Sequence, residues 1–363
     1  MKKIIIVSPF NPYLHKGGLE NYVLELYNFL RSRFDVKILT SESSGENVLG
    51  VGGKTILSGT YPILDTVEIF ESLNKFKPDV VILNTRFFYN NYGIAKHCKE
   101  HGIPYIHIEH GTGFVKTSNP FVFLISRIYD ITRGKYVLEN AKYVFAVSTK
   151  AKEFCKSLSG RRDVKLLYPR FDYKFFTKSG NADKKSVGIT FIGRLIYAKG
   201  VQDLIEAFRR IPGDNLVLNI VGGGNYEKTL RNLASGDSRV KFLGEMNRLH
   251  IRNILNKTDI FVNPSYSEGM PYSVLEAASM KCAVVATDVG GTKEIIRNGV
   301  SGYIINAKNV EMLAEKTKLL INDKHLRSMF GNAARKSVLN FVKTNRKQYD
   351  TVLETLSSLP ISS

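Results

Sequence analysis

Two glutamates in the second half of the chain, Glu268 and Glu276, carry the clearest chemistry in the sequence. The stretch around them predicts a strand over 260–262, a loop carrying Glu268, a helix over about 272–280, a buried strand over 283–286 and a Gly-Gly turn. A helix N-terminus presents unpaired N–H groups and partial positive charge, which suits a diphosphate. Carboxylates beside it can accept hydrogen bonds from the hydroxyls of a sugar or a ribose. The stretch therefore predicts a site for a nucleotide sugar.

The spacing of these glutamates belongs to a longer pattern. After Glu276 come Ala277-Ala278, Val284-Val285-Ala286-Thr287-Asp288, Gly290-Gly291 and Glu294. The whole pattern resembles the donor-site signature of retaining glycosyltransferase family 4, and the resemblance extends from Gly17-Gly18 to about Arg335. It implies the GT-B fold, an α/β architecture in which two Rossmann-like domains face each other across a cleft.

Two cations are placed to meet the diphosphate of such a donor. Arg194 follows a predicted strand over 187–192 and Lys199 opens the next helix, so both can reach the crevice at the carboxyl ends of the strands. There they would neutralise a departing diphosphate. Taken alone, they are more simply explained as solvated loop charges, but the match to the family's Gly-Arg and Lys-Gly pattern favours the functional interpretation.

The sequence predicts no metal site and no cofactor besides the donor. It contains no Asp-x-Asp and no cluster of His, Asp and Cys with metal-ligand spacing. We therefore expect metal-independent catalysis with a nucleoside-diphosphate sugar as substrate, UDP-sugar being favoured over GDP- and ADP-sugars.

Glycines and a helix start complete the predicted donor site. Gly17-Gly18 lie at a strand-to-helix turn, where the backbone can approach a phosphate, and Gly222-Gly223 would border the nucleotide. Either pair could equally be a plain turn. The family usually has Glu-Gly-Phe-Gly where this chain has Glu268-Gly269-Met270-Pro271. Because proline lacks an N–H, the phosphate donors would be Tyr272 and Ser273.

A histidine provides the candidate group in the first half. His110 follows an apolar strand over 105–108 and precedes Gly111. A lone histidine is most often structural, but the His-Gly-Thr run resembles a family segment whose histidine lies beside the donor sugar. The resemblance implies front-face transfer with retention, in which His110 positions the sugar or the acceptor. Glu109 is the competing candidate.

The elements that position these residues form two domains. A chain of 363 residues with 43% hydrophobic and 23% charged residues exceeds one core, and its alternating strands and helices predict parallel sheets. The predicted boundaries are an N-terminal acceptor-binding domain over 1–178, a linker over 179–186, a C-terminal donor-binding domain over 187–340, and a final helix over 341–363 that returns to the first domain. The three cysteines are expected to be buried thiols.

The apolar segment 120–131 and the basic residues after it allow two interpretations. Net charge is +19, and residues 133–162 are rich in Lys and Arg. An apolar helix beside basic residues is typical of peripheral contact with an anionic membrane, but a core helix with a solvated face explains it equally well. The N-terminal run over 4–7 is too short for a signal peptide and no stretch spans a bilayer, so a cytoplasmic location is expected, with attachment to the cytoplasmic face of the inner membrane left open.

These features predict a retaining hexosyltransferase acting on a glycan or polyprenyl-linked acceptor in cell-surface polysaccharide or lipopolysaccharide assembly. A nucleotide-sugar epimerase on the same fold is the enzymatic alternative. A basic nucleic-acid-binding protein is the alternative of a different class, although no nucleic-acid-binding motif supports it.

Overall fold

A computed structural model describes residues 1–15, 17–56, 61–115, 119–180 and 186–361. The chain forms two compact units. Unit 1 comprises Met1–Arg170 and Asn345–Ser363, and unit 2 comprises Phe171–Thr344.

Unit 1 is built on a parallel sheet that is seven-stranded within the described residues, with the strand order β3-β2-β1-β6-β7-β8-β9. Its central strands are almost entirely buried and mostly apolar because helices cover both faces. The strands are β1 Lys3–Val7, β2 Asp35–Ser41, β3 Val48–Val51, β6 Val80–Asn84, β7 Tyr105–Glu109, β8 Tyr143–Ala146 and β9 Lys165–Leu166.

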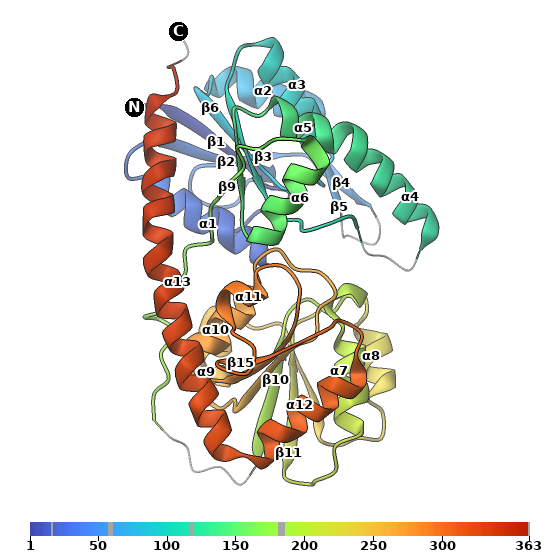
Figure 1. Ribbon diagram of the computed structural model, residues 1–363. Helices are drawn as coiled ribbons and strands as arrows, with labels where there is room; N and C mark the ends of the chain where they lie inside the picture. Colours follow the sequence, from blue (N-terminus) through green and yellow to red (C-terminus); the bar gives the residue numbers. More distant parts are fainter. Residues whose placement is uncertain (16, 57–60, 116–118, 181–185, 362–363) are drawn as a thin grey trace. The chain divides into compact units, whose positions relative to one another are not determined.

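The helices of unit 1 follow the strands in βαβ order (Figure 1). They are α1 Gly18–Leu30, α2 Thr66–Phe76, α3 Asn90–Glu100, α4 Pro120–Tyr129, α5 Lys135–Asn140 and α6 Thr149–Ser159, with a π-helical turn η1 Asp130–Gly134 joining α4 to α5. An antiparallel hairpin of β4 Gly53–Ile56 and β5 Tyr61–Leu64, which the sequence pattern did not predict, precedes α2. Cys98 and Cys155 are buried free thiols in this unit, and Cys282 is one in unit 2, as expected.

Unit 2 repeats the architecture with a parallel sheet, six-stranded in the described part of the chain, in the order β12-β11-β10-β13-β14-β15. Its strands are β10 Val187–Ile192, β11 Leu216–Val221, β12 Val240–Gly244, β13 Ile260–Asn263, β14 Ala283–Thr287 and β15 Gly302–Ile305. Its helices are a 3₁₀ turn η2 Tyr197–Lys199, α7 Val201–Arg209, α8 Glu227–Leu233, α9 Arg248–Asn256, α10 Tyr272–Ser279, α11 Thr292–Ile295 and α12 Val310–Asn322.

In each sheet, the direction in which successive strands are added reverses at one point. In unit 2 the chain moves outward from β10 to β12 and then returns to the other side of β10 with β13. In unit 1 the same reversal lies between β1 and β6. Open parallel sheets bind ligands beyond the carboxyl ends of the strands at such a reversal. The fold therefore marks the loops after β10 and β13, and those after β1 and β6, as candidate sites.

The last helix, α13 Lys324–Ser358, belongs to both units. In unit 2, the Arg335 guanidinium donates to the carbonyls of Phe176 (2.7 Å) and Ser279 (2.9 Å). In unit 1, the Asn345 amide donates to the carbonyl of Pro169 (2.6 Å), and the Lys2 ammonium donates to carbonyls at the end of the helix, those of Leu356, Ser357 and Leu359.

The boundary between the units lies earlier than the predicted one, at 170/171 instead of 178/179. The boundary lies there because the segment after Arg170 packs in unit 2, where Phe171 and Phe176 are 7% and 1% exposed. Most of the predicted linker, residues 181–185, lies outside the described residues. The segment 345–363 groups with unit 1, and residues 341–344 with unit 2.

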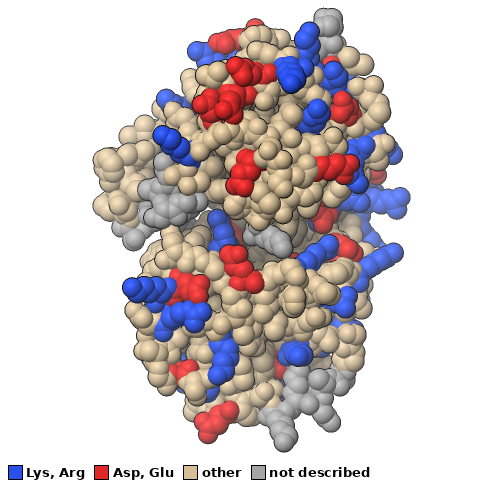
Figure 2. All heavy atoms as spheres, turned by 180° about the vertical axis from the view of Figure 1, so that it is seen from behind, with Lys and Arg blue, Asp and Glu red and all other residues tan. Residues whose placement is uncertain are grey.

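Charged side chains are scattered over both units. On the face shown in Figure 2, Lys and Arg are interspersed with Asp and Glu and form no continuous basic stripe. The excess of positive charge is therefore not gathered on this face into the footprint that a nucleic-acid duplex requires.

Candidate functional site

The loops after β10 and β13 bring a predicted cation and a predicted carboxylate together in unit 2. The Lys199 ammonium lies 2.7 Å from Oε1 of Glu268, and the two side chains are 18% and 12% exposed. The Ser265 hydroxyl donates to the same oxygen at 2.7 Å. The sequence predicted both charged residues at this edge of the sheet but did not predict the contact between them. The ion pair holds each group in position while leaving part of each accessible.

The backbone around Glu268 is fixed by a neighbouring glycine turn. Gly290 adopts a φ of +53°, and a Cβ there would lie within 2.6 Å of the carbonyl oxygens of Glu268 and Gly269. The Gly291 N–H donates to the Gly269 carbonyl at 2.8 Å. Only glycine permits this approach, so the Gly-Gly turn after β14 holds the Glu268 loop against the sheet.

A second close approach involves the glycines after β11. Gly222 has a φ of +130°, and a Cβ there would collide with the Gly193 carbonyl oxygen at 2.0 Å. The Leu195 N–H also donates to the Gly223 carbonyl at 2.7 Å. The contact fixes the backbone on both sides of Arg194. Gly222 and Gly223 therefore shape the loop that carries Arg194, whatever ligand contacts they make themselves.

Arg194 differs from Lys199 in its surroundings. It is exposed, and its side chain makes no ion pair or hydrogen bond to any residue that the structure describes. Its loop is held by the two backbone contacts described above and by a third, in which the Gly193 N–H donates to the Val221 carbonyl at 3.0 Å. An unpaired guanidinium on a fixed loop at the switch point of the sheet is suited to an anionic ligand.

Helix α10 begins close to Glu268. Pro271 is its N-cap residue, no side chain caps this end, and Met270 before it is 7% exposed. Helix geometry leaves the first N–H groups, those of Tyr272 and Ser273, without acceptors inside the helix. The predicted donor role for these two groups fits this geometry. At the other end, Lys281 has a φ of +57°, a left-handed conformation that favours glycine after a helix.

Glu276 lies one turn into α10 and is 9% exposed. Its carboxyl group makes no hydrogen bond to other residues in the described part of the chain. Burial raises the pKa of this carboxyl to about 8, although the distant Arg248 acts in the opposite direction. Buried carboxyl groups normally have donors, so this one is available to a ligand's hydroxyls.

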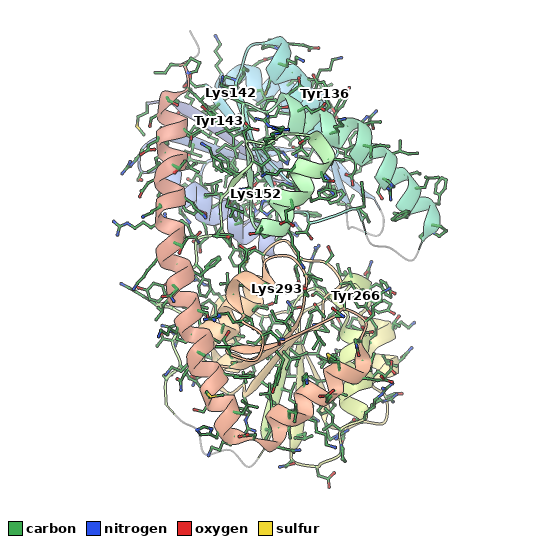
Figure 3. All side chains as sticks on the ribbon, viewed as in Figure 1. Tyr136, Lys142, Tyr143, Lys152, Tyr266 and Lys293 are labelled. Atoms are coloured by element: carbon green, nitrogen blue, oxygen red, sulfur yellow. The ribbon has the colours of Figure 1, made fainter. Side chains whose placement is uncertain are left out.

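Tyr266 and Lys293, labelled in Figure 3, lie at the same end of unit 2 as these loops. The Tyr266 hydroxyl donates to Asp203 at 2.8 Å and accepts from Gln202 at 2.7 Å, which ties the loop after β13 to α7. Lys293 forms an exposed ion pair with Asp288 at 2.6 Å. The sequence analysis did not select these residues, which support the loops.

His110 lies in unit 1 directly after β7. Its Nε2 is 3.2 Å from Oδ1 of Asn84, whose amide donates to the Val7 carbonyl at 3.0 Å, so Asn84 presents an acceptor and Nε2 carries the proton. The ring of Tyr22 meets the imidazole edge-to-face at 4.8 Å. Burial lowers the pKa of His110 to about 4, more strongly than the nearby Glu109 raises it. His110 is therefore a neutral imidazole whose Nδ1 can accept a hydrogen bond.

The predicted phosphate loop of unit 1 follows β1. Gly17 is the N-cap of α1, in extended conformation with a φ of −153°, and Gly18 is exposed in the first turn. No side chain caps this helix end. A Cβ at Gly17 would meet only the flexible end of Glu20. The position therefore does not need glycine for the fold of unit 1, and the predicted approach of a phosphate to this turn stays a prediction.

Glu109, the competing candidate, is fully buried. Its Oε1 lies 2.9 Å from Nη1 of Arg86, and its Oε2 lies 3.0 Å from Nε2 of His107. Burial raises the pKa of this carboxyl, but Arg86, His107 and the N–H of Gly111 outweigh it and hold the pKa at about 2. With 0% exposure, Glu109 cannot contact a substrate. It is a positioning residue that anchors the backbone on both sides of His110.

Arg86 extends this anchor to α4. Its Nε lies 3.0 Å from Oδ1 of Asp130, the first residue of the π-helical turn η1, and its Nη2 donates to the Gly113 carbonyl at 2.7 Å. Burial raises the pKa of Asp130 to about 6, against the influence of Arg86. The sequence analysis missed Arg86 and Asn84. Their position after the apolar strand β6, at the carboxyl edge of a parallel sheet, is the signal that could have found them.

Within the described ranges, no group of three or more His, Cys, Asp or Glu side chains is arranged to hold a metal ion.

The predicted site residues form two sets, one in each unit. Unit 2 holds Arg194, Lys199, Gly222, Gly223, Glu268, Gly269, Met270, Tyr272, Ser273 and Glu276, and unit 1 holds Gly17, Gly18 and His110.

Two Rossmann-like units, the second with an uncapped helix start and paired charges at its switch point, form the architecture of the GT-B class of glycosyltransferases. Two family profiles match consecutive parts of the chain: "Glycosyltransferase Family 4" over residues 16–173 and "Glycosyl transferases group 1" over residues 172–337. The chain belongs to the family 4 glycosyltransferases.

Curated relatives agree with this assignment. An uncharacterised glycosyltransferase of Methanocaldococcus jannaschii is 28% identical over 98% of this chain and 100% of its own length. The N,N'-diacetylbacillosaminyl-diphospho-undecaprenol alpha-1,3-N-acetylgalactosaminyltransferase of Campylobacter jejuni is 31% identical over 60% of this chain and 59% of its own. The UDP-Gal:alpha-D-GlcNAc-diphosphoundecaprenol alpha-1,3-galactosyltransferase of Escherichia coli is 25% identical over 93% and 94%.

Solved structures confirm the fold. Sucrose-phosphate synthase from Thermosynechococcus elongatus superposes with a TM-score of 0.84 at 18% identity, over 99% of this chain and 100% of the other. Anabaena HepE in complex with UDP-glucose gives 0.81 at 20% identity with the same coverage. The predicted GT-B fold is confirmed, and the alternative of a non-catalytic nucleic-acid-binding protein is set aside.

Proposed function

We propose that the protein transfers a sugar from UDP to a lipid-linked glycan, with retention of anomeric configuration and without a metal ion. The observation that carries the proposal is the charge arrangement at one edge of unit 2. An exposed, unpaired Arg194, the Lys199–Glu268 pair and the uncapped start of α10 suit a diphosphate and its sugar, and the isolated carboxyl of Glu276 suits ribose hydroxyls.

The relatives support the choice of donor and acceptor. The Escherichia coli relative is named for a UDP-linked galactose, and both bacterial relatives are named for acceptors linked to diphosphoundecaprenol. A lipid-linked acceptor lies at a membrane surface, so the proposal includes peripheral contact with an anionic membrane. The pathway class would be polysaccharide or glycolipid assembly.

In this proposal each residue acts by binding and positioning. Arg194, Lys199 and the N–H groups of Tyr272 and Ser273 would stabilise the negative charge on the departing diphosphate. Glu268, held by Lys199, would accept hydrogen bonds from the sugar. His110 would accept a hydrogen bond from a hydroxyl of the sugar or the acceptor through Nδ1, and Gly17 and Gly18 would let backbone approach the donor.

The test is nucleotide binding in the presence of a chelator. Isothermal titration calorimetry with UDP, GDP and ADP should show tightest binding for UDP, and Arg194→Ala should weaken it about tenfold or more, because one charge-assisted contact is lost. Arg210→Ala is the matched control, since Arg210 lies at the other end of α7, 46% exposed and paired with Glu206. Equal weakening by both variants would contradict the assigned site. Tighter binding of GDP or ADP would overturn the choice of base, and binding that appears only after a divalent ion is added would overturn metal independence.

Product analysis separates transfer from epimerisation. With a diphosphoundecaprenol-linked sugar as acceptor, NMR of the product should show the anomeric configuration of the donor retained. An epimerase would convert the donor without acceptor. It would need an acid and a base beside the sugar, whereas Glu109 is fully buried and the low pKa of His110, about 4, makes its imidazole a poor proton donor and a weak base at neutral pH.

His110 gives a prediction about pH. Because its pKa is about 4, the imidazole is already neutral at the low end of the usual assay range, between about pH 6 and 9. The pH profile of kcat/KM should therefore have the same shape in the wild type and in His110→Gln, because His110 does not titrate in this range. That variant should lower kcat by about tenfold to a hundredfold while leaving UDP affinity unchanged. A limb near pH 6.5 present only in the wild type would refute the neutral assignment.

A further inference from the structure

Helix α4 carries an apolar stripe that nothing in the described structure covers. Its large side chains recur with helical spacing and are strongly exposed: Phe121 68%, Leu124 54%, Ile125 51% and Ile128 51%. Ile131, in the following π-helical turn, is 49% exposed. No residue of α4 is buried. The interpretation of this segment as a core helix is therefore wrong.

The exposure is built into the fold. The Asn119 side chain caps the start of α4 by accepting from the N–H groups of Phe121 (3.0 Å) and Val122 (3.3 Å). At the other end, the buried Asp130 is held by Arg86. The helix start is thus closed by its own cap and its end is anchored to unit 1, and Figure 1 shows α4 extending away from the sheet of unit 1.

The charge that α4 and the turn η1 show to solvent is positive. Between residues 119 and 134 the charged side chains are Arg127, Asp130 and Arg133, and Asp130 is fully buried. Lys135, which follows, forms an ion pair with the exposed Glu139 at 3.6 Å. In Figure 2 the lobe formed by α4 is almost free of charged atoms, while side chains of both signs lie on the neighbouring part of unit 1. An apolar helix face whose own exposed charges are arginines is the pattern of a helix that lies in an anionic bilayer interface.

Aromatic rings accompany these cations. The Arg133 guanidinium lies 5.5 Å from the ring centre of Tyr89 and 5.3 Å from that of Tyr92, and Tyr89 is 46% exposed. The Tyr129 hydroxyl donates to the Phe88 carbonyl, which places this cluster beside the end of α4. Tyrosine and arginine are the residues that sit at the level of lipid head groups.

The basic residues further along the chain do not join this surface. Lys142 lies at the start of β8 and Lys152 in the first turn of α6, and Figure 3 shows them at different ends of unit 1. Arg161 is used internally, donating to the Leu138 carbonyl and pairing with Asp163. Lys142, Lys152 and Arg161 therefore do not extend the surface around α4, whose own cations are Arg127 in the helix and Arg133 in the turn η1.

We infer that the α4 face, defined by Phe121, Leu124, Ile125, Ile128 and Ile131, docks in the interface of an anionic lipid bilayer, with Arg127 and Arg133 contacting the head groups. The inference rests on the proposed function, because a lipid-linked acceptor is what the docked enzyme would meet there. No helix in the described part of the chain is long and apolar enough to cross a bilayer, so the contact is one of surface insertion.

The absence of tryptophan from the sequence gives a direct test. Phe121→Trp places a single fluorophore on the stripe of the full chain. Its emission should shift to shorter wavelength with vesicles containing phosphatidylcholine and phosphatidylglycerol, less so with phosphatidylcholine alone, and the shift should weaken as salt is added. Leu249→Trp, on the 50% exposed Leu249 of α9 in unit 2, is the control and should not shift.

Ile128→Glu supplies the loss-of-binding variant, because it replaces a half-exposed side chain and should leave thermal stability unchanged. It should lower the vesicle partition coefficient at least about tenfold, whereas Leu249→Glu should not. Vesicle binding that is absent, or unaffected by Ile128→Glu, would overturn the inference. So would a dimer in sedimentation that Ile128→Glu dissociates, since the occupant of the stripe would then be a second copy.

UDP binding is measured on the same samples without lipid. Its absence would refute the proposed donor site independently of the vesicle result. Intact UDP binding with no vesicle binding would refute the docking surface and leave the donor site standing.

Discussion

Replacing Glu276 by glutamine is expected to reduce UDP affinity by about a hundredfold or more and to reduce transfer at least as much. The buried carboxyl is the acceptor proposed for the ribose hydroxyls. A hydrogen bond to a charged group contributes about 1.5–3 kcal/mol, and about 1.4 kcal/mol corresponds to a factor of ten. Two such bonds would therefore account for at least this loss. Calorimetry with UDP measures it directly.

The same substitution should not unfold the protein, and its effect on stability has a defined sign. The pKa of Glu276 in the folded chain is about 8, above its ordinary value of 4.5, so the folded state binds a proton that the unfolded state releases between these values. Wild-type stability therefore falls as pH rises through this window. Glutamine does not titrate, so denaturation should show the variant gaining relative stability from about pH 4.5 to about pH 8. The exposed Glu311→Gln is the control.

Proton release provides a second readout. Hydroxyl donors favour the ionised carboxylate, so UDP binding at pH 7 should expel the proton from Glu276. Calorimetry in buffers of different ionisation enthalpy detects this release. The terminal phosphate of UDP, with a pKa near 6, also titrates, and comparison with Glu276→Gln isolates the contribution of the protein. Identical release by both proteins would show that Glu276 does not contact the nucleotide.

Replacing Arg86 by methionine should have the largest effect on stability. The guanidinium is fully buried between two fully buried carboxylates, Glu109 and Asp130. Removing the cation leaves these groups uncompensated, which typically costs about 3–5 kcal/mol. Chemical denaturation should show this loss. The control is Arg31→Met, because Arg31 pairs with Glu46 at 2.7 Å but both side chains are well exposed, so little change is expected there.

The stability deficit of Arg86→Met should shrink in acid. In the wild type, Arg86 and its neighbours hold the pKa of Glu109 near 2, so this carboxylate stabilises the fold above its ordinary pKa and loses that contribution as pH falls toward 2. Without Arg86, burial raises the pKa, and the carboxyl relieves its cost by taking up a proton. Adding Glu109→Gln and Asp130→Asn to Arg86→Met should recover part of the stability. A deficit that is constant with pH would show that packing, and not charge, causes the loss.

The sequence predicted the elements of unit 2 that position the donor site, because they combine short buried strands with glycine turns and charged residues at strand ends. It identified Lys199 and Glu268 but not their contact, since the loops that carry them come from strands far apart along the chain. It missed β3, β9, β15 and the hairpin β4–β5, which are short strands that contain Gly, Pro or Lys and so lack an apolar run.

Three features were not predicted because they depend on the surroundings of a residue in the folded chain, and sequence periodicity carries no information about those surroundings. The apolar pattern of α4 is the same for a helix facing a core and for one facing solvent. Arg86 and Asp130 read as surface charges until the fold brings them together across 44 positions. The domain boundary moved because Phe171 and Phe176, in a segment that resembled the end of the first domain, are buried in the second.

The division of unit 1 between the two ends of the chain has a consequence for biosynthesis. Lys2, next to the first strand, donates to the carbonyls of Leu356, Ser357 and Leu359, so this contact of unit 1 forms only when the last turns of α13 have been made. Domains normally fold as they emerge from the ribosome, at about 5–20 residues per second. Here residues 1–170 must wait about 10–40 seconds for their closing helix at that rate, while residues 171–344, which form a continuous unit, emerge complete before it. Unit 2 is thus expected to reach its native state first, and a nascent chain stalled after residue 344 should hold a folded donor domain beside an unfinished first domain.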